Sequence, residues 1–198
     1  MKRLLIGICL FVLVGCQPNK TSFDNLLVYP EGKTLQAFTV MDHHENTFDN
    51  QSLKGHWSIL FLGFTFCPDI CPTTLTDLNR VYPELKKIDE KVQVLLLTAD
   101  PSRDTPARLK AYIEFFNPEF VALRAPHKDL LPFTRNLGLV YAMHGEGDDY
   151  LINHSASLVI IGPDGRIRAM LKPDAGGVPP SVDLSQLPAV VKYLKNTL

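Results

Sequence analysis

The feature that most constrains the fold is an almost wholly apolar run, WSILFLGFTF, at residues 57–66. A strand with apolar side chains on both faces must be covered on both faces, as in the central sheet of an α/β protein. A second run of this kind, VQVLLLT, occupies residues 92–98. Between the two runs, apolar residues recur at helical spacing from 72 to 88. Two buried strands joined by a helix predict a three-layer α/β sandwich.

The rest of residues 26–198 continues this alternation without an internal repeat or a second linker. Near its start, two short apolar segments flank a polar turn at 42–46 and predict an N-terminal hairpin. The other predicted elements are a helix at 106–116 with Thr105 as N-cap, a strand at 120–123, a helix at 129–137 that ends at Gly138, strands at 157–161 and 166–171, and a closing helix at 184–194. The last two strands form a hairpin, so we expect the central sheet to be mixed.

The first sixteen residues carry the features of an export signal. Lys2 and Arg3 precede an apolar stretch at 4–14, which is too short to cross a bilayer as a helix of about 20 residues. A basic start and a short apolar stretch are typical of a secretory signal peptide. The next residues, LVGC at 13–16, resemble the lipobox of bacterial lipoproteins, in which the cysteine is lipidated. An ordinary signal peptide with an incidental cysteine is the alternative.

This interpretation divides the chain into a signal peptide at 1–15, a lipidated tether at 16–25 that begins with Cys16, and one domain at 26–198. It places the protein in the bacterial cell envelope, held by its lipid anchor and facing the periplasm or the outer side, with the inner membrane favoured over the outer. That compartment is oxidising. The net charge of −1 supplies no positive field, so we expect no nucleic-acid partner.

Two of the four cysteines, Cys67 and Cys71, lie where the apolar run at 57–66 ends and the next helix begins. Ligand sites in open α/β sheets lie at the carboxyl ends of the strands. Pro72 fits the first position of the helix, which would place Cys71 near its N-cap. Because a helix N-terminus favours negative charge, both thiols are expected to ionise more readily than a free cysteine.

Three interpretations of this cysteine pair remain open at this point. A structural disulfide would close only a short loop and would stabilise the fold little. A redox-active dithiol usually has two intervening residues, whereas this pair has three. A metal site is favoured, and two thiolates suit the soft ion Cu(I) better than zinc, which usually takes four ligands in a structural site. A histidine could complete the ligand set.

The chain has six histidines that could supply this ligand. His43 and His44 fall in the polar hairpin turn, where we expect solvated side chains. Three others fall before the first apolar strand or in loops: His56, His127 and His144. His154 lies just before the strand at 157–161, and position alone favours a structural role for such a histidine.

Three motifs, in this order along the chain, resemble those of the Sco/SenC family. They are FTFCPDICP at 64–72, DPSRDT at 100–105, and DY at 149–150 followed by NHS at 153–155. The similarity runs from about Phe38 to Gly165 and so covers most of the domain. The chain departs from the family pattern at Asn153, where an aspartate is common, and at Ala99, which is smaller than the usual residue.

The resemblance implies a membrane-tethered, thioredoxin-like domain that binds copper through Cys67, Cys71 and His154. Family members assist assembly of the dinuclear copper centre of cytochrome c oxidase, so the implied partners are its copper-bearing subunit and a protein that returns thiol electrons. The implied cargo is Cu(I), with Cu(II) as a further state. Asn153 puts the orientation of the neighbouring imidazole in question.

Two rival functions come from other classes. In the first, the protein is an enzyme, a copper-independent thiol–disulfide reductase or thioredoxin-like peroxidase, with Cys67 as the attacking thiolate and Cys71 as the resolving thiol. In the second, it is a copper-responsive sensor that changes partners on loading. We expect Arg103 and Asp104 to form a loop near the site, as a structural ion pair or a helix start, with partner recognition as the alternative.

Overall fold

The structure, a computed structural model, describes residues 23 and 25–198, except 146, 148, 175 and 177–179. Its strands are β1 (Leu26–Lys33), β2 (Thr39–Asp42), β3 (Thr47–Asp49), β4 (Ser58–Gly63), β5 (Gln93–Thr98), β6 (Val121–Arg124), β7 (Tyr141–His144), β8 (Leu151–His154), β9 (Leu158–Ile161) and β10 (Ile167–Leu171). Its helices are α1 (Ile70–Ile88), α2 (Pro106–Phe116), α3 (His127–Leu137) and α4 (Leu187–Thr197), with a 3₁₀ turn at Leu184–Gln186.

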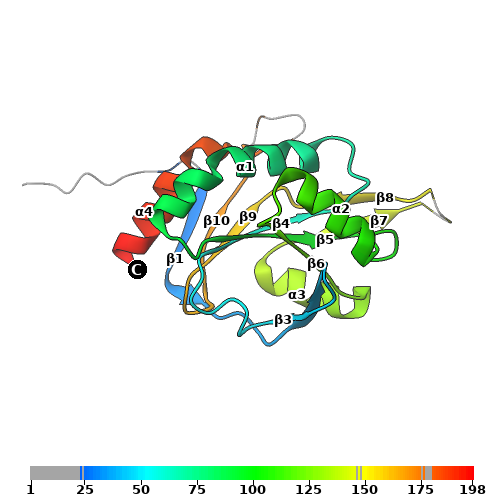
Figure 1. Ribbon diagram of the computed structural model, residues 1–198, viewed down its shortest axis with the longest axis horizontal. Helices are drawn as coiled ribbons and strands as arrows, with labels where there is room; N and C mark the ends of the chain where they lie inside the picture. Colours follow the sequence, from blue (N-terminus) through cyan, green and yellow to red (C-terminus); the bar gives the residue numbers. More distant parts are fainter. Residues whose placement is uncertain (1–22, 24, 146, 148, 175, 177–179) are drawn as a thin grey trace, which may run out of the picture.

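Eight strands form one mixed sheet in the order β1-β10-β9-β4-β5-β6-β2-β3 (Figure 1). The central strands β4, β5 and β6 are parallel, and β9 lies antiparallel to β4. All six residues of β4 are buried, as expected for a strand covered on both faces. The hairpin of β2 and β3 closes one edge of the sheet and β1 closes the other.

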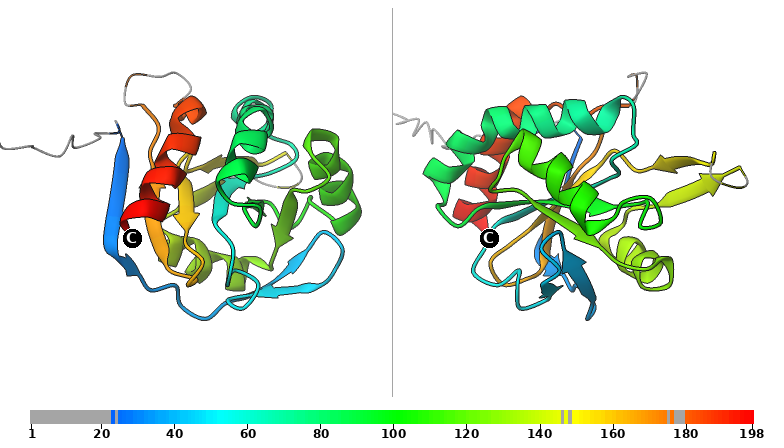
Figure 2. Two further views of the ribbon diagram at one scale, coloured as in Figure 1. Left: turned by 60° about the vertical axis from the view of Figure 1, so that its left-hand side comes forward. Right: turned by 45° about the vertical axis from the view of Figure 1, so that its right-hand side comes forward.

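Helices cover both faces of this sheet (Figures 1 and 2). Helices α1, α2 and α4 lie together on one face, and α3 lies on the other. The crossovers from β4 to β5 and from β5 to β6 run in the same direction, so right-handed connections place α1 and α2 on the same face. The expected three-layer sandwich with a mixed sheet and an N-terminal hairpin is confirmed.

Two features of the fold were not expected from the sequence. The first is β1, whose segment LLVYPEGK contains Pro30 and Gly32. Pro30 is tolerated because β1 is an edge strand, where a missing N–H need not remove a ladder hydrogen bond. The second is a separate two-stranded ribbon of β7 and β8, which projects from the body of the domain (Figure 2).

Several boundaries also differ from the prediction, and the start of α1 matters most for the site. The helix begins at Ile70, with Asp69 as its N-cap residue, so Pro72 is the third helical residue and not the first. A proline fits there because the first four N–H groups of a helix have no partner within the helix. Cys71 therefore lies inside the first turn. The predicted closing helix is a 3₁₀ turn followed by α4, which has Pro188 in its first turn.

Candidate metal centre

Three elements bring the predicted ligands together at the carboxyl end of β4. Cys67 lies in the loop after β4, Cys71 lies in the first turn of α1, and His154 is the last residue of β8. One donor atom from each residue lies within 4.8 Å of the other two. Cys71 is fully buried, whereas Cys67 and His154 are partly exposed. Both cysteines are free thiols.

The imidazole of His154 is oriented so that one nitrogen faces the thiols. Its Nδ1 lies 3.0 Å from the carbonyl oxygen of Ser155, and a carbonyl can only accept a hydrogen bond. Nδ1 therefore carries the proton, and the Nε2 lone pair points at Cys71 Sγ, 3.5 Å away. The rings of Phe61 and Phe64 meet the imidazole edge-on at centroid distances of 6.1 and 5.7 Å. These contacts fix the orientation of the ring for metal binding.

The two thiols have opposite acidities because of their mutual contact. A hydrogen bond from the Cys71 thiol lowers the pKa of Cys67 to about 4, and backbone N–H groups at the start of α1 add to this effect. The pKa of Cys71 is raised by the same hydrogen bond and by burial. Cys67 is therefore a thiolate at neutral pH, and Cys71 keeps its proton until a metal ion displaces it.

The loop that carries Cys67 is held from behind by the buried carboxylate of Asp104. Its oxygens accept hydrogen bonds from the Thr65 backbone N–H at 3.1 Å, from the Thr65 hydroxyl at 2.5 Å and from the Thr98 hydroxyl at 2.5 Å. Burial raises the pKa of Asp104. The Thr65 N–H donates to Asp104 and so is not available to a neighbouring strand. Strand β4 accordingly ends at Gly63, before the predicted end at residue 66.

Asp104 does not form an ion pair with Arg103; it directly precedes Thr105, the N-cap of α2, so of the two structural expectations only the helix start describes its place. Arg103 binds Asp100 instead, with Nε 2.5 Å from Oδ2, and it donates to the carbonyl oxygen of Tyr150 at 3.2 Å. The Tyr150 hydroxyl completes the cluster by donating to Asp100 at 2.5 Å. Tyr150 immediately precedes β8, so this cluster fixes the strand that ends in His154. The motif at 100–105 thus supports both the loop that carries Cys67 and the strand that carries His154.

Gly63 is a further site residue that the sequence analysis missed. A Cβ atom at Gly63 would lie 3.0 Å from Cys71 Sγ and 2.9 Å from the Phe61 ring. A side chain there would therefore displace the buried sulfur. The only sequence signal was one glycine at the end of an apolar strand, which indicates close packing without naming the partner.

The expected solvated turn at His43 and His44 is wrong for His43. Its side chain is only 5% exposed, and its Nδ1 accepts a hydrogen bond from the Ala122 backbone N–H at 3.1 Å. Donor atoms of His43, His44 and Glu114 also lie within 4.8 Å of one another. However, a neutral His43 with an accepting Nδ1 has its proton on Nε2 and no lone pair left for a metal.

The other histidines lie away from the cysteines. The half-buried His56 contacts the Lys91 carbonyl oxygen through Nδ1 at 2.9 Å. His127 begins α3 and lies 2.9 Å from the Tyr141 hydroxyl, and His144 ends β7. His127 and His144 therefore lie in a helix and a strand, and not in loops as the sequence predicted.

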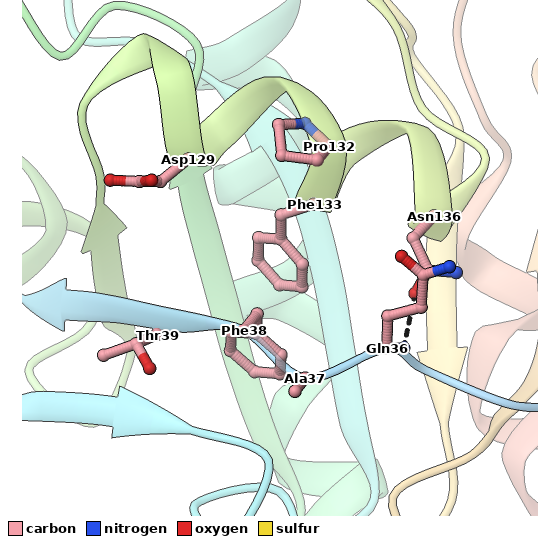
Figure 3. Close-up of a pocket in the computed structure, with 8 residues that line it drawn as sticks. All are labelled: Gln36, Ala37, Phe38, Thr39, Asp129, Pro132, Phe133 and Asn136. Atoms are coloured by element: carbon pink, nitrogen blue, oxygen red, sulfur yellow. Dashed lines mark hydrogen bonds between the residues drawn. The ribbon is translucent and has the colours of Figure 1, made fainter.

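Two hollows are relevant to the choice of site. A cavity of about 590 Å³ opens beside Cys67 and His154 and is also lined by Ile152, Pro173 and Pro180. A second hollow, between the start of β2 and α3, contains the stacked rings of Phe38 and Phe133. As Figure 3 shows, the residues that line it include no cysteine or histidine, so we assign it no chemistry.

The expected signal peptide and Cys16 lie outside the described residues, as does all of the tether except residues 23 and 25. Across the residues that the structure does describe, no helix is both long enough and apolar enough to traverse a bilayer.

Comparisons with known proteins match most of this chain to one family. The family model described as SCO1/SenC matches residues 29–182. A Stutzerimonas stutzeri protein whose name refers to copper binding is 39% identical over 151 residues, 75% of this chain and 74% of that protein. The structure of Bradyrhizobium japonicum ScoI with copper bound is 27% identical, with a TM-score of 0.67 over 82% of this chain and 98% of the other. Copper-bound yeast Sco1 is also 27% identical, with a TM-score of 0.69 over 82% and 89%. These neighbours confirm the thioredoxin-like fold.

Proposed function

The chain belongs to the SCO1/SenC family, and from this premise we propose that it binds copper through Cys67, Cys71 and His154 and serves assembly of the dinuclear copper centre of cytochrome c oxidase. One observation supports the ligand assignment above all others. The lone pair of His154 Nε2 faces Cys71 Sγ at 3.5 Å, within a cluster that also contains Cys67.

The donor set fits Cu(I), which prefers thiolates and accepts imidazole. Cys67 supplies a thiolate already formed, and Cys71 releases its proton as the ion binds. Two thiolates and Cu(I) leave a charge of −1, which the N-terminus of α1 stabilises. His154 is the neutral and more exchangeable ligand, so a receiving protein could displace it first. Cu(II) is a further state, since imidazole also suits that ion.

Copper binding requires the reduced thiols. Oxidation joins the two sulfurs in a disulfide and removes two electrons and the one proton that Cys71 still carries, which leaves neither sulfur as a thiolate ligand. In an oxidising compartment the pair therefore needs a thiol reductant protein that returns two electrons. The redox state of the pair would then control copper loading.

The decisive experiment is an anaerobic Cu(I) titration of the reduced full chain in detergent, against a chromophoric competitor. We expect one Cu(I) per chain, loss of binding in Cys67→Ala and weaker binding in His154→Ala. The matched control is His144→Ala, which removes an exposed histidine of β7 and should bind as the wild type does. Wild-type affinity in His154→Ala would remove the histidine from the ligand set.

The physiological part of the proposal is tested in a deletion strain. We expect low cytochrome c oxidase activity that is restored by the wild-type gene and, in part, by added copper. The Cys67→Ala gene should not restore it. Unchanged oxidase activity in the deletion strain would favour a role in general redox defence.

We also propose that residues 1–15 are removed as a signal peptide and that Cys16 is lipidated, so that the domain at 26–198 faces the periplasm or the outer side from the inner membrane. The sequence LVGC at 13–16 supports this arrangement. Mass spectrometry should find an acylated Cys16 as the new N-terminus. Cys16→Ser should move the protein from the membrane fraction to the soluble fraction. An unmodified Cys16 on the wild-type chain would contradict the anchor.

The second candidate function is a copper-independent thiol–disulfide reductase or peroxidase. It is favoured by one observation: the partly exposed Cys67 has a pKa lowered to about 4, next to the buried Cys71. An acidic outer thiol and a buried partner suit attack and resolution. Turnover of a disulfide or peroxide that survives copper removal and His154→Ala would support this function.

A further inference from the structure

A third hollow, of about 470 Å³, lies on the side of the Cys67 loop that faces α2. It is lined by Thr65, Phe66, Arg108, Ala111, Tyr112 and Phe115, which we call the α2 patch. Phe66 immediately precedes Cys67 and is 48% exposed, and Phe115 is 82% exposed. Large aromatic side chains this exposed are uncommon on a surface that only meets water.

The α2 patch carries one positive charge that no acidic residue described in the structure pairs with. The guanidinium groups of Arg103 and Arg108 lie 4.9 and 4.4 Å from the centroid of the Phe66 ring. Arg103 is paired with Asp100. Arg108 forms no salt bridge with any acidic residue that the structure describes. The patch is therefore apolar, with a free guanidinium at its border.

The position of the α2 patch ties it to copper exchange. A protein that takes copper from Cys67 must contact the surface around this residue, and a specific interface covers about 800 Å² on each partner. Phe66 adjoins Cys67 in the chain, so such a footprint includes it. Exposed aromatic and arginine side chains are also the types that contribute most to binding energy at protein interfaces.

We propose that the α2 patch is the docking surface for the protein that exchanges copper with Cys67, an inference that rests on the proposed function. The partner presents an apolar side chain to the hollow between Phe66 and Phe115. Beside it, a carboxylate pairs with the guanidinium of Arg108. Docking here leaves His154 and the cavity beside it, on the other side of the loop, free for ligand exchange.

The test uses the copper-loaded full chain in detergent and the copper-free soluble domain of the oxidase's copper-bearing subunit from the same organism. The variants are Arg108→Glu and Phe115→Ser. Their matched controls on α3, in the opposite layer, are Lys128→Glu, with the same change of charge, and Leu131→Ser, which replaces a side chain that is 37% exposed. Cu(I) titration of each variant should give the wild-type affinity, because none of these residues is a proposed ligand.

We expect each patch variant to slow copper transfer at least about tenfold, as the loss of an important interface contact does, and both controls to transfer at the wild-type rate. Raising the ionic strength should slow the wild type more than Arg108→Glu, because only the wild type has the attractive charge. Wild-type transfer rates in both patch variants would overturn the docking surface and leave the proposed function intact. Absence of transfer by the wild-type protein would overturn both.

Discussion

His154 and His43 are both restrained imidazoles with potential metal ligands close by, but their Nδ1 atoms have opposite partners. Nδ1 of His154 meets the carbonyl oxygen of Ser155, so its proton is held there and Nε2 is left with a lone pair. Nδ1 of His43 meets the N–H of Ala122, so the proton is held on Nε2. The backbone group next to Nδ1 therefore decides which histidine can bind a metal, and the number of histidines and carboxylates nearby does not.

Removing ligands from each cluster in turn gives the largest expected difference between them. Cys71→Ser replaces a soft sulfur by a hard oxygen and should lower the affinity for Cu(I) more than about 100-fold, the upper end of the effect of losing a supporting contact. The double variant His43→Ala/His44→Ala should bind Cu(I) with wild-type affinity. Anaerobic competition titrations measure both. Weaker Cu(I) binding in the double histidine variant would mean that our assignment of the His43 proton is wrong.

The two clusters also differ in the contacts that support them. The loop of Cys67 depends on Asp104, whereas in the other cluster His44 and Glu114 are exposed. Asp104→Ala would leave the Thr65 N–H and two hydroxyls without their acceptor, and each unsatisfied group costs about 1–3 kcal/mol. We expect a lower free energy of unfolding for the reduced, copper-free protein and Cu(I) affinity about 10- to 100-fold weaker.

Urea unfolding and Cu(I) titration test this prediction. Asp104→Asn keeps an acceptor for Thr65 and should recover much of both losses. Asp129→Ala, which removes an exposed carboxylate of α3, should change neither. If Asp104→Ala bound copper as the wild type does, the loop would not depend on this carboxylate.

These supporting contacts mark the limit of what the sequence could predict. Apolar runs and periodicity predict the central strands and helices because burial on both faces leaves a strong pattern. They miss β1, which contains a proline, and the β7–β8 ribbon, where only Ile152 is buried. The sequence therefore placed His154 in front of a strand, although it ends one.

The same limit applies to the candidate site. Cys67 and Cys71 are close in sequence, and their place between a strand and a helix predicted a site at a sheet edge. His154 is 83 residues from Cys71, and only a family resemblance singled it out. The partners of Asp104 and the fit of Gly63 against Cys71 Sγ depend on tertiary distances, which no local pattern encodes.

A smaller effect concerns the acidity of Cys67. Because its pKa is lowered to about 4, the Cys67 thiolate is fully formed across neutral pH. The rate of Cys67 alkylation by iodoacetamide should therefore be nearly constant from about pH 6 to 8. An ordinary thiol with a pKa near 8.5 reacts much faster at the upper end of this range. In Cys71→Ala the stabilising hydrogen bond is lost, and the rate should rise with pH. Mass spectrometry identifies the alkylated residue, and a steep pH dependence in the wild type would contradict this account.

The smallest expected effect tests the proton on His43. Burial, and next the neighbouring His44, lower the pKa of His43 below its usual 6.5. The native state therefore binds the second imidazole proton less readily than the unfolded state does. The contribution of neutral His43 to stability is complete above about pH 6.5 and is lost as the pH falls through the lowered pKa. His43→Asn should reduce the free energy of unfolding at pH 7 by roughly 1 kcal/mol, since a buried hydrogen bond is weakened. Its deficit relative to the wild type should shrink towards about pH 5, because the variant lacks this titration.

Urea unfolding of both proteins across this pH range measures the deficit, and a deficit that stays constant would mean that His43 does not titrate as described. Repeating the measurement with added zinc separates a structural imidazole from a ligand. An ion that binds only the native state raises the free energy of unfolding. Zinc should therefore give the wild type no stabilisation that His43→Asn lacks, because the lone pair of His43 Nδ1 is already engaged by the backbone of β6.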